Sequence, residues 1–243
     1  MPQNGTTDAE FADIPTAVEE FRKGRFVIVV DDEDRENEGD ICLAAEHVTP
    51  EAIALLINRA RGFLCVAVAP QIADRLDLHP MVEENRSAFG TPFTVTVDAR
   101  EGITTGVSAE DRAKTIRLIV TEDARPQDLV RPGHILPLQA RPGGTLVRAG
   151  HTEAAVDLAR MAGLKPAALI CEVMNEDGSM ARLPQLQELA QELDISICSI
   201  ADLIRYRHQS EYLVTKKVRV QLPTRHGQFR LHYYRSMVDD KEH

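Results

Sequence analysis

The hydrophobic residues of this chain follow two patterns, which predict helices and strands that alternate along the sequence. Ile14, Ala17, Val18 and Phe21 have the spacing of one face of a short amphipathic helix, and Gly24 is placed to end it. Continuous apolar runs bounded by turn residues predict buried strands instead. These strands are expected over residues 26–30, 41–45, 63–69, 93–98, 167–173 and 195–198.

Capping residues mark the ends of the other predicted helices. Thr49 followed by Pro50 is an N-cap with proline at the first helical position, and Gly62 is placed to stop that helix. Ser108, with Asp111 three residues later, resembles a capping box that opens another helix. Further helices are expected over residues 152–163, 184–193 and 199–207.

The order of these elements decides the fold class. Helices and strands interleave, but several strands are separated only by turns, so a purely parallel doubly wound sheet fits poorly. We predict an α+β fold, layered α/β/α around a mixed twisted sheet. The 243 residues are enough for a single compact domain with a C-terminal tail, which we place at residues 1–209 and 210–243.

Composition narrows the classes of function. The net charge of −10 argues against a nucleic-acid partner, because such binding relies on a basic surface. No apolar run has the length of a membrane span, and residues 1–12 lack the pattern of a secretory signal. Cys42, Cys65, Cys171 and Cys198 lie in apolar runs without paired spacing, so we expect reduced, buried thiols in a cytoplasmic protein.

An acidic loop directly follows the first predicted strand. Seven acidic residues stand within the ten positions 31–40. Such a run is most often a solvated loop. At the end of a buried strand it can also hold a divalent cation, which screens carboxylates that would otherwise repel one another. Arg35, amid the acids, suits a substrate phosphate or a neighbouring carboxylate.

A second segment, residues 141–153, joins glycines and basic side chains to the start of a predicted helix. A helix N-terminus offers unpaired N–H groups and a positive dipole end to an anion. An ordinary strand–turn–helix connection with Thr152 as the cap is the alternative. Because Arg148 and His151 are present, a phosphate or metal site is as well supported as this ordinary connection.

Two further residues and one segment each have both a structural and a chemical interpretation. His134, held between two prolines, is either a structural hydrogen-bonding residue or a general acid or base. Glu172 interrupts an apolar strand and is either an edge residue or a proton carrier. The hydroxyls and glycines of residues 102–112 form a turn and cap, or bind substrate hydroxyls.

Taken together and in this order, four motifs resemble the 3,4-dihydroxy-2-butanone 4-phosphate synthase family. They are the acidic loop, Thr-Thr-Gly-Val-Ser, Arg-Pro-Gly-His and Gly-His-Thr-Glu-Ala, and the resemblance covers most of residues 14–208. It implies conversion of D-ribulose 5-phosphate to L-3,4-dihydroxy-2-butanone 4-phosphate and formate in riboflavin biosynthesis, through a metal-stabilised enediolate. It also implies a homodimer with sites near the interface.

The resemblance assigns roles residue by residue. It implies Mg²⁺ or Mn²⁺, two ions per site, with Glu36 and His151 as protein ligands. His134 and Glu172 match the catalytic positions, and Glu38 is a further acid–base group. The implied substrate-binding residues are Arg35, Glu36, Asp40, Thr105, Arg148, Ala149, Gly150, His151, Thr152 and Glu172.

The tail and the rival functions complete the expectations. From about residue 212 the sequence resembles the opening of a GTP cyclohydrolase II domain, but no cysteine triad for its zinc follows. We expect no cyclohydrolase activity from this chain and a disordered or loosely packed tail.

Two alternative functions are left open by the sequence. One is a scaffold protein whose acidic loop is merely solvated, and the other is a sugar-phosphate isomerase or aldolase that releases no formate.

Overall fold

The computed structural model describes residues 11–236, 238 and 241–242. Its main sheet has seven strands in the order β4-β5-β3-β6-β2-β1-β7. β1 pairs parallel with β7 and β3 with β5, while the other neighbouring pairs are antiparallel, so the sheet is mixed, as predicted. The strands are β1 (Val27–Val30), β2 (Gly39–Ala44), β3 (Cys65–Val68), β4 (Val97–Ala99), β5 (Leu129–Gln139), β6 (Ala167–Glu172) and β7 (Ser196–Ser199).

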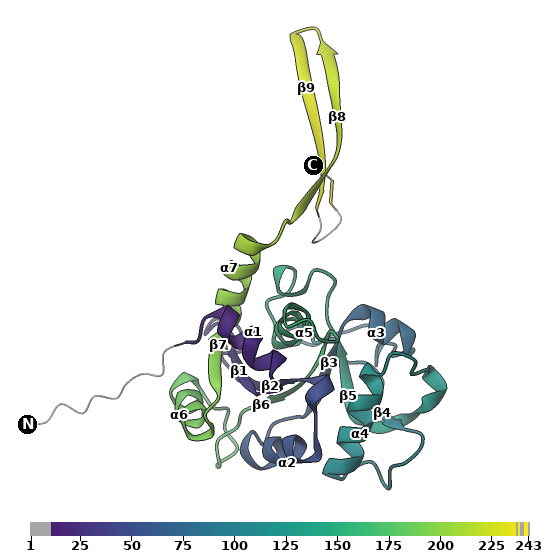
Figure 1. Cartoon of the computed structure of the whole chain (residues 1–243), viewed down its shortest axis with the longest axis vertical. Helices are drawn as coiled ribbons and strands as arrows, with labels where there is room; N and C mark the ends of the chain where they lie inside the picture. The colour runs from purple at the N-terminus through teal and green to yellow at the C-terminus, as the bar shows by residue number, and fades with distance from the viewer. Residues whose placement is uncertain (1–10, 237, 239–240, 243) are drawn as a thin grey trace, which may run out of the picture.

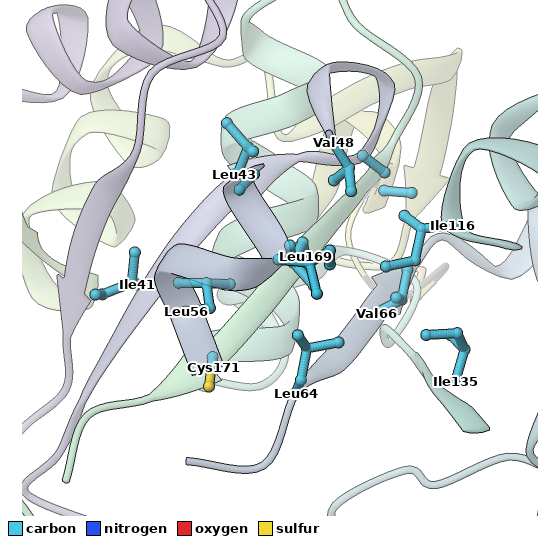
Figure 2. Close-up of a cluster of buried hydrophobic side chains, with 14 of the residues drawn as sticks. Ile41, Leu43, Val48, Leu56, Leu64, Val66, Ile116, Ile135, Leu169 and Cys171 are labelled. Atoms are coloured by element: carbon cyan, nitrogen blue, oxygen red, sulfur yellow. The ribbon is translucent and has the colours of Figure 1, made fainter. Parts of the chain in front are cut away.

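Helices cover both faces of this sheet, which confirms the predicted layers (Figure 1). On one face the core joins the sheet to α1 (Ile14–Arg22), α5 (His151–Met161) and α7 (Ile200–Ser210). The core on the other face includes Leu56, Leu64, Ile116 and Leu169, which Figure 2 shows packed together. Its helices are α2 (Pro50–Arg59), α3 (Pro70–Arg75), α4 (Ala109–Val120) and α6 (Leu183–Leu193).

The predicted caps explain where several helices begin. Thr49 accepts a hydrogen bond from the N–H of Ala52 at the start of α2, and Ser108 accepts one from Asp111 at the start of α4. Thr152, however, is not a cap. α5 begins one residue earlier at His151, and its N-cap is Gly150, which has no side chain to close the helix end.

One strand differs from its predicted position, and one was not predicted. The strand expected over 93–98 is the shorter β4, and Phe93 forms only an isolated bridge with Leu138. β5 is an eleven-residue strand that carries His134 at its centre. The proline and glycine of residues 132–133 hid its first half, because both residues are rare inside strands.

The tail forms an antiparallel hairpin, so the expectation of disorder is wrong for its described residues. β8 (Val214–Thr224) and β9 (Gly227–Ser236) pair along their length and extend away from the main sheet (Figure 1). Most of their residues are exposed, which agrees with loose packing. Residues 1–10, 237, 239–240 and 243 are not among the residues that the structure describes. The expectation of no secretory signal in residues 1–12 therefore falls mostly outside the described residues.

Four free cysteines, Cys42, Cys65, Cys171 and Cys198, are all buried, as expected. Burial raises the pKa of Cys171 and Cys198 to about 12, which keeps both thiols protonated. Among the described helices, none is both long and apolar enough to cross a membrane.

A buried ion pair fixes the loop that precedes α5. Asp157 on α5 accepts hydrogen bonds from the N–H and the hydroxyl of Thr145, each at 2.8 Å. Arg207 on α7 lies 2.7 Å from the same carboxylate and donates to the carbonyl of Gly143 at 2.9 Å. Both charged side chains are almost fully buried. The pair therefore ties the turn η3 (Gly144–Leu146) to two helices.

Arg207→Met is expected to lower the free energy of unfolding by about 3 kcal/mol, because it leaves the Asp157 carboxylate buried without its partner. Chemical denaturation measures the change. Arg205→Met in the same helix is the control, since its pair with Asp202 is largely exposed and is worth about 1 kcal/mol or less. Equal stability losses in the two variants would contradict this account.

Candidate active site

One pocket collects most of the residues that the sequence singled out. It has a volume of about 140 Å³ and lies at the ends of β2 and β6, beside the N-terminus of α5. Asp40 and Glu172 are direct partners in the antiparallel register of β2 and β6. Side chains alternate along a strand, so both acids share the α5 face with Cys42 and Ile170. The lining residues are Arg35, Glu36, Glu38, Asp40, Cys65, Thr91, Phe93, Leu138, Arg148, His151, Thr152, Ile170 and Glu172.

Asp31 organises the acidic loop from within. Its side chain is only 1% exposed and accepts hydrogen bonds from the backbone N–H groups of Glu36 at 3.0 Å and Glu38 at 2.8 Å. It also receives the Arg35 guanidinium at 2.8 Å. From the other side, Arg182 donates to the carbonyl of Glu36 at 3.0 Å. These contacts fix the part of the loop that carries Glu36 and Glu38, while residues 32–34 are exposed to solvent.

A carboxylate–imidazole cluster stands at the pocket. Potential ligand atoms of Asp31, Glu36 and His151 all lie within 4.8 Å of one another. Glu36 Oε2 is 3.4 Å from His151 Nδ1. Asp40 Oδ1 and His151 Nε2 are buried without a hydrogen-bond partner. Such orphaned atoms fit a site for a divalent cation, because a cation supplies the partner that the protein does not.

The charges of this cluster depend on one another. Burial raises the pKa of Glu36, but His151 and Arg35 outweigh it and hold that pKa at about 2. Burial lowers the pKa of His151, and Asp40, Glu36 and Asp31 together raise it to about 9. Burial is the main cause that raises the pKa of Asp40 to about 7. Without a cation, the imidazolium and the Arg35 guanidinium are therefore the positive charges that balance these acids.

A basic side chain near the start of α5 also lines the pocket. This is Arg148, and its Nη1 is 2.6 Å from Oε2 of the fully buried Glu153. Glu153 Oε1 accepts a hydrogen bond from the N–H of Arg141 at 3.0 Å. A Cβ on Gly150 would lie 2.2 Å from Arg148 Nη1, so a larger residue here would displace the guanidinium from this position. With Ala149 and Gly150 leading into α5, the guanidinium and the helix N-terminus form a site for an anion.

An exposed loop covers both arginines of the pocket. The Phe89 ring centroid is 5.4 Å from the Arg35 guanidinium carbon, a cation–π contact. The carbonyl of Phe89 accepts from Arg148 Nη2 at 3.2 Å. These contacts link it both to the acidic loop and to the segment before α5.

Glu172 is held with its carboxylate at the pocket. Its Oε2 accepts a hydrogen bond from the N–H of Phe63 at 2.7 Å. Glu38 lines the same pocket, and burial followed by repulsion from Glu36 and Glu172 raises its pKa. Two carboxyl groups with different environments suit proton donation and proton acceptance.

Four predicted site residues do not line this pocket: Ala149 and Gly150, which lead into α5, and two residues that lie apart from it. His134 is half exposed on β5, and its side chain contacts Asp98 of β4. Thr105 is exposed in the loop before α4. The structure thus brings eight of the twelve predicted residues together: Arg35, Glu36, Glu38, Asp40, Arg148, His151, Thr152 and Glu172.

Sequence reasoning missed three acids that support the site. Asp31 was read only as part of the acidic run, although its place at the very end of a buried strand was a signal. Glu153 had a signal too, since a first-turn acid beside Arg148 is a natural ion-pair partner. No signal in the sequence marked Asp98, because its contact with His134 depends on the pairing of β4 with β5.

Comparison with known proteins gives this arrangement a family. The model of the 3,4-dihydroxy-2-butanone 4-phosphate synthase family matches residues 15–206. Riboflavin biosynthesis protein RibBA of Aquifex aeolicus is 53% identical over 96% of this chain, and the match spans 58% of that relative. A relative from Arabidopsis thaliana, a monofunctional riboflavin biosynthesis protein RIBA 2, chloroplastic, is 50% identical and matches over 49% of its length. The chain therefore spans about half the length of these relatives.

Solved structures agree in fold. RibBX, a two-domain 3,4-dihydroxy-2-butanone 4-phosphate synthase from A. baumannii, matches 95% of this chain and 68% of its own with a TM-score of 0.88 and 45% identity. A 3,4-dihydroxy-2-butanone 4-phosphate synthase in complex with two magnesium ions matches with a TM-score of 0.79 and 39% identity, over 82% of this chain and 98% of its own. On the family match over most of the main sheet and its helices, this chain belongs to the 3,4-dihydroxy-2-butanone 4-phosphate synthase family.

Proposed function

We propose that this chain converts D-ribulose 5-phosphate to L-3,4-dihydroxy-2-butanone 4-phosphate and formate, as a lyase of riboflavin biosynthesis. The observation that carries the proposal is one pocket that joins a carboxylate–imidazole cluster to a helix N-terminus and an arginine. Glu36 and His151 belong to the cluster, His151 begins α5, and Arg148 lines the same pocket. A sugar phosphate has the matching polarity, with hydroxyl and carbonyl oxygens at one end and a dianion at the other.

The residues of the cluster fit Mg²⁺ or Mn²⁺, two ions per site. Glu36 and His151 are the proposed ligands, and Asp31 is close enough to join them or to hold them in place. The magnesium complex of the related synthase supports this cation class. When bound, the cation polarises the sugar's carbonyl oxygen and acidifies the adjacent C–H.

The remaining roles follow from position. Arg148, Ala149, Gly150 and Thr152 bind the phosphate, because they surround the start of α5. Arg35 and Asp40 orient the sugar hydroxyls in the same pocket. Glu172 exchanges protons with the carbon skeleton, since its carboxylate is fixed by the Phe63 N–H while it lines the pocket. Glu38 and His134 are the further acid–base groups.

The test is formate release. Purified protein is incubated with ribulose 5-phosphate and Mg²⁺, with and without a chelator. We expect one formate per sugar, lost on chelation and restored by added metal. Turnover of the sugar without formate would favour an isomerase or aldolase instead. No turnover by a metal-loaded protein would leave a scaffold as the better account.

We propose a homodimer with its sites near the subunit interface. His134 and Thr105 stand outside the pocket on an exposed surface, and Phe63 and Val107 expose 61% and 52% of their area. Apolar side chains exposed to this degree beside catalytic candidates suit a subunit contact that brings those candidates to a pocket. Sedimentation should give a dimer of the 27.0 kDa chain, and a fully active monomer would overturn the proposal.

We propose that residues 1–209 form the synthase domain and residues 210–243 a linker and the start of a GTP cyclohydrolase II-like domain. The hairpin β8–β9 supports this division, because it projects from the main sheet and pairs only with itself among the described strands. Longer relatives named bifunctional riboflavin biosynthesis proteins support it as well. We expect no GTP hydrolysis from these 243 residues, so measured turnover of GTP would overturn this part.

A cytoplasmic location is our proposal for the cellular compartment, on the basis of four buried, reduced thiols. Relatives from rice and Arabidopsis are named as chloroplastic proteins. A fluorescent fusion in the native cell tests the proposal, and fluorescence confined to an organelle or the cell exterior would contradict it.

Glu153→Gln tests the basic side chain of the pocket. The amide removes the charge that holds Arg148 in place, so we expect KM for ribulose 5-phosphate to rise about 10-fold or more, with a smaller change in kcat. Steady-state kinetics measure both constants. Glu188→Gln, an acid on α6 away from this pocket, is the control. An unchanged KM in Glu153→Gln would show that Arg148 needs no such support.

A further inference from the structure

His134 and Asp98 form a close pair that lies apart from the pocket. The backbone N–H of His134 donates to Asp98 Oδ1 at 2.9 Å, and His134 Nδ1 lies 2.7 Å from Asp98 Oδ2. Each carboxylate oxygen therefore contacts a different nitrogen of the same residue. Asp98 is buried, whereas the His134 side chain is 48% exposed. The histidine thus presents its ring to the surface from a buried anchor.

The surrounding backbone is built around this pair. Gly106 has a φ of +93°, and a Cβ there would lie 2.4 Å from both Asp98 Oδ2 and His134 Nδ1. Any larger residue would have to enter the space of the Asp98–His134 contact. Asp111 fixes the glycine by accepting from its N–H at 3.0 Å, and it also accepts from the Thr104 hydroxyl at 2.7 Å. The loop next to Thr105 therefore closes over the side of the ring that carries Nδ1.

We infer that Asp98 is a positioning residue, which holds the proton of neutral His134 on Nδ1 and leaves Nε2 as the atom that exchanges protons with substrate. A carboxylate only accepts hydrogen bonds, so the nitrogen that faces it must carry hydrogen. The partner of one ring nitrogen decides the state of the other. The inference rests on the proposed catalytic role of His134, and it adds the reacting atom and the residue that selects it.

The isosteric variant Asp98→Asn reverses this selection. Its amide oxygen can still accept from the His134 N–H, but its NH₂ group then faces Nδ1. The ring must accept there, so the proton moves to Nε2 and the reacting atom is blocked. We expect kcat for formate release to fall about 100-fold or more with KM little changed, as for a catalytic histidine held in the wrong tautomer.

Two readouts test the inference. Nitrogen-15 NMR of the full chain, with the His134 signals assigned by their absence in His134→Asn, reports the tautomer directly. We expect Nδ1 protonated in the wild type and Nε2 protonated in Asp98→Asn. In a His134→Asn background, Asp98→Asn should cause no further loss of activity, because the two residues act as a unit. Asp123→Asn, an exposed aspartate after α4, is the matched control and should change neither readout.

The outcomes separate this inference from the proposed function. A wild-type spectrum with the proton on Nε2 overturns the inference, whatever Asp98→Asn does, and needs only His134→Asn for its assignment. A tautomer change in Asp98→Asn without loss of activity overturns the catalytic role of His134 and the inference with it. Absence of formate release in the wild type, with Nδ1 protonated as expected, overturns the proposed function but keeps Asp98 as the residue that selects the tautomer.

Discussion

Glu36→Gln is expected to weaken Mg²⁺ binding by more than about 100-fold and to abolish most formate release. Glu36 is the residue that connects the acidic cluster, since its carboxylate lies 2.7 Å from Arg35 and 3.4 Å from His151. Its low pKa of about 2 means that it is a charged ligand throughout the neutral range. Loss of a ligand should exceed the 10- to 100-fold effect of losing a residue that only orients one.

Isothermal titration of Mg²⁺ into each variant measures the affinity. The amide keeps the size of the side chain, and Arg35 keeps its contact with Asp31, so the loop should retain its fold. Glu33→Gln is the matched control, because it removes the same charge from an exposed position of the same loop. Equal affinities in the two variants would indicate a general attraction of cations by the loop instead of a site at Glu36.

The sequence predicted those parts of the fold that depend on local chemistry. The residues Thr49 and Ser108 identified the starts of α2 and α4, because a capping side chain acts within its own turn. Gly150 lacks a side chain, so the start of α5 was shifted to Thr152. A Cβ at this position would displace the end of the Arg148 side chain, a contact that local capping rules do not include. Local rules failed where a backbone position serves the site.

The tail shows a different limit. Its hairpin could have been predicted, since Val218, Val220 and Leu222 alternate with polar residues and a turn precedes Gly227. The expectation of disorder came from the view that its partner strands were missing. β8 and β9 pair with each other along their inner edges, so the hairpin forms without further partner strands.

The site was predictable as a set of residues but not as a geometry. The motifs identified Glu36, His151 and Glu172 as candidate site residues, because carboxylate and imidazole side chains suit metal binding and proton transfer. No motif indicates that Asp40 and Glu172 are cross-strand neighbours, since this depends on the antiparallel pairing of β2 with β6. The separation of His134 from the pocket depends on its position along β5, since Leu138 of the same strand lines the pocket.

Glu172→Gln is expected to reduce formate release by about 100- to 10,000-fold while Mg²⁺ affinity changes little. The amide oxygen can still accept the hydrogen bond from the Phe63 N–H, so the side chain keeps its place. What it loses is the ability to take up and return a proton. Because Glu172 is not one of the three clustered ligands, its loss should separate proton transfer from metal binding.

Parallel assays of formate and Mg²⁺ binding make this separation visible. Glu176→Gln is the control, since that acid is exposed just beyond the end of β6. Loss of metal affinity together with activity would identify Glu172 as a ligand, and full activity would leave Glu38 as the pocket's acid–base group. Burial raises the pKa of Glu38, and repulsion from the charge of Glu172 raises it further. The variant should therefore also lower the pKa of Glu38. The protonation of each carboxyl group thus depends on the charge of the other.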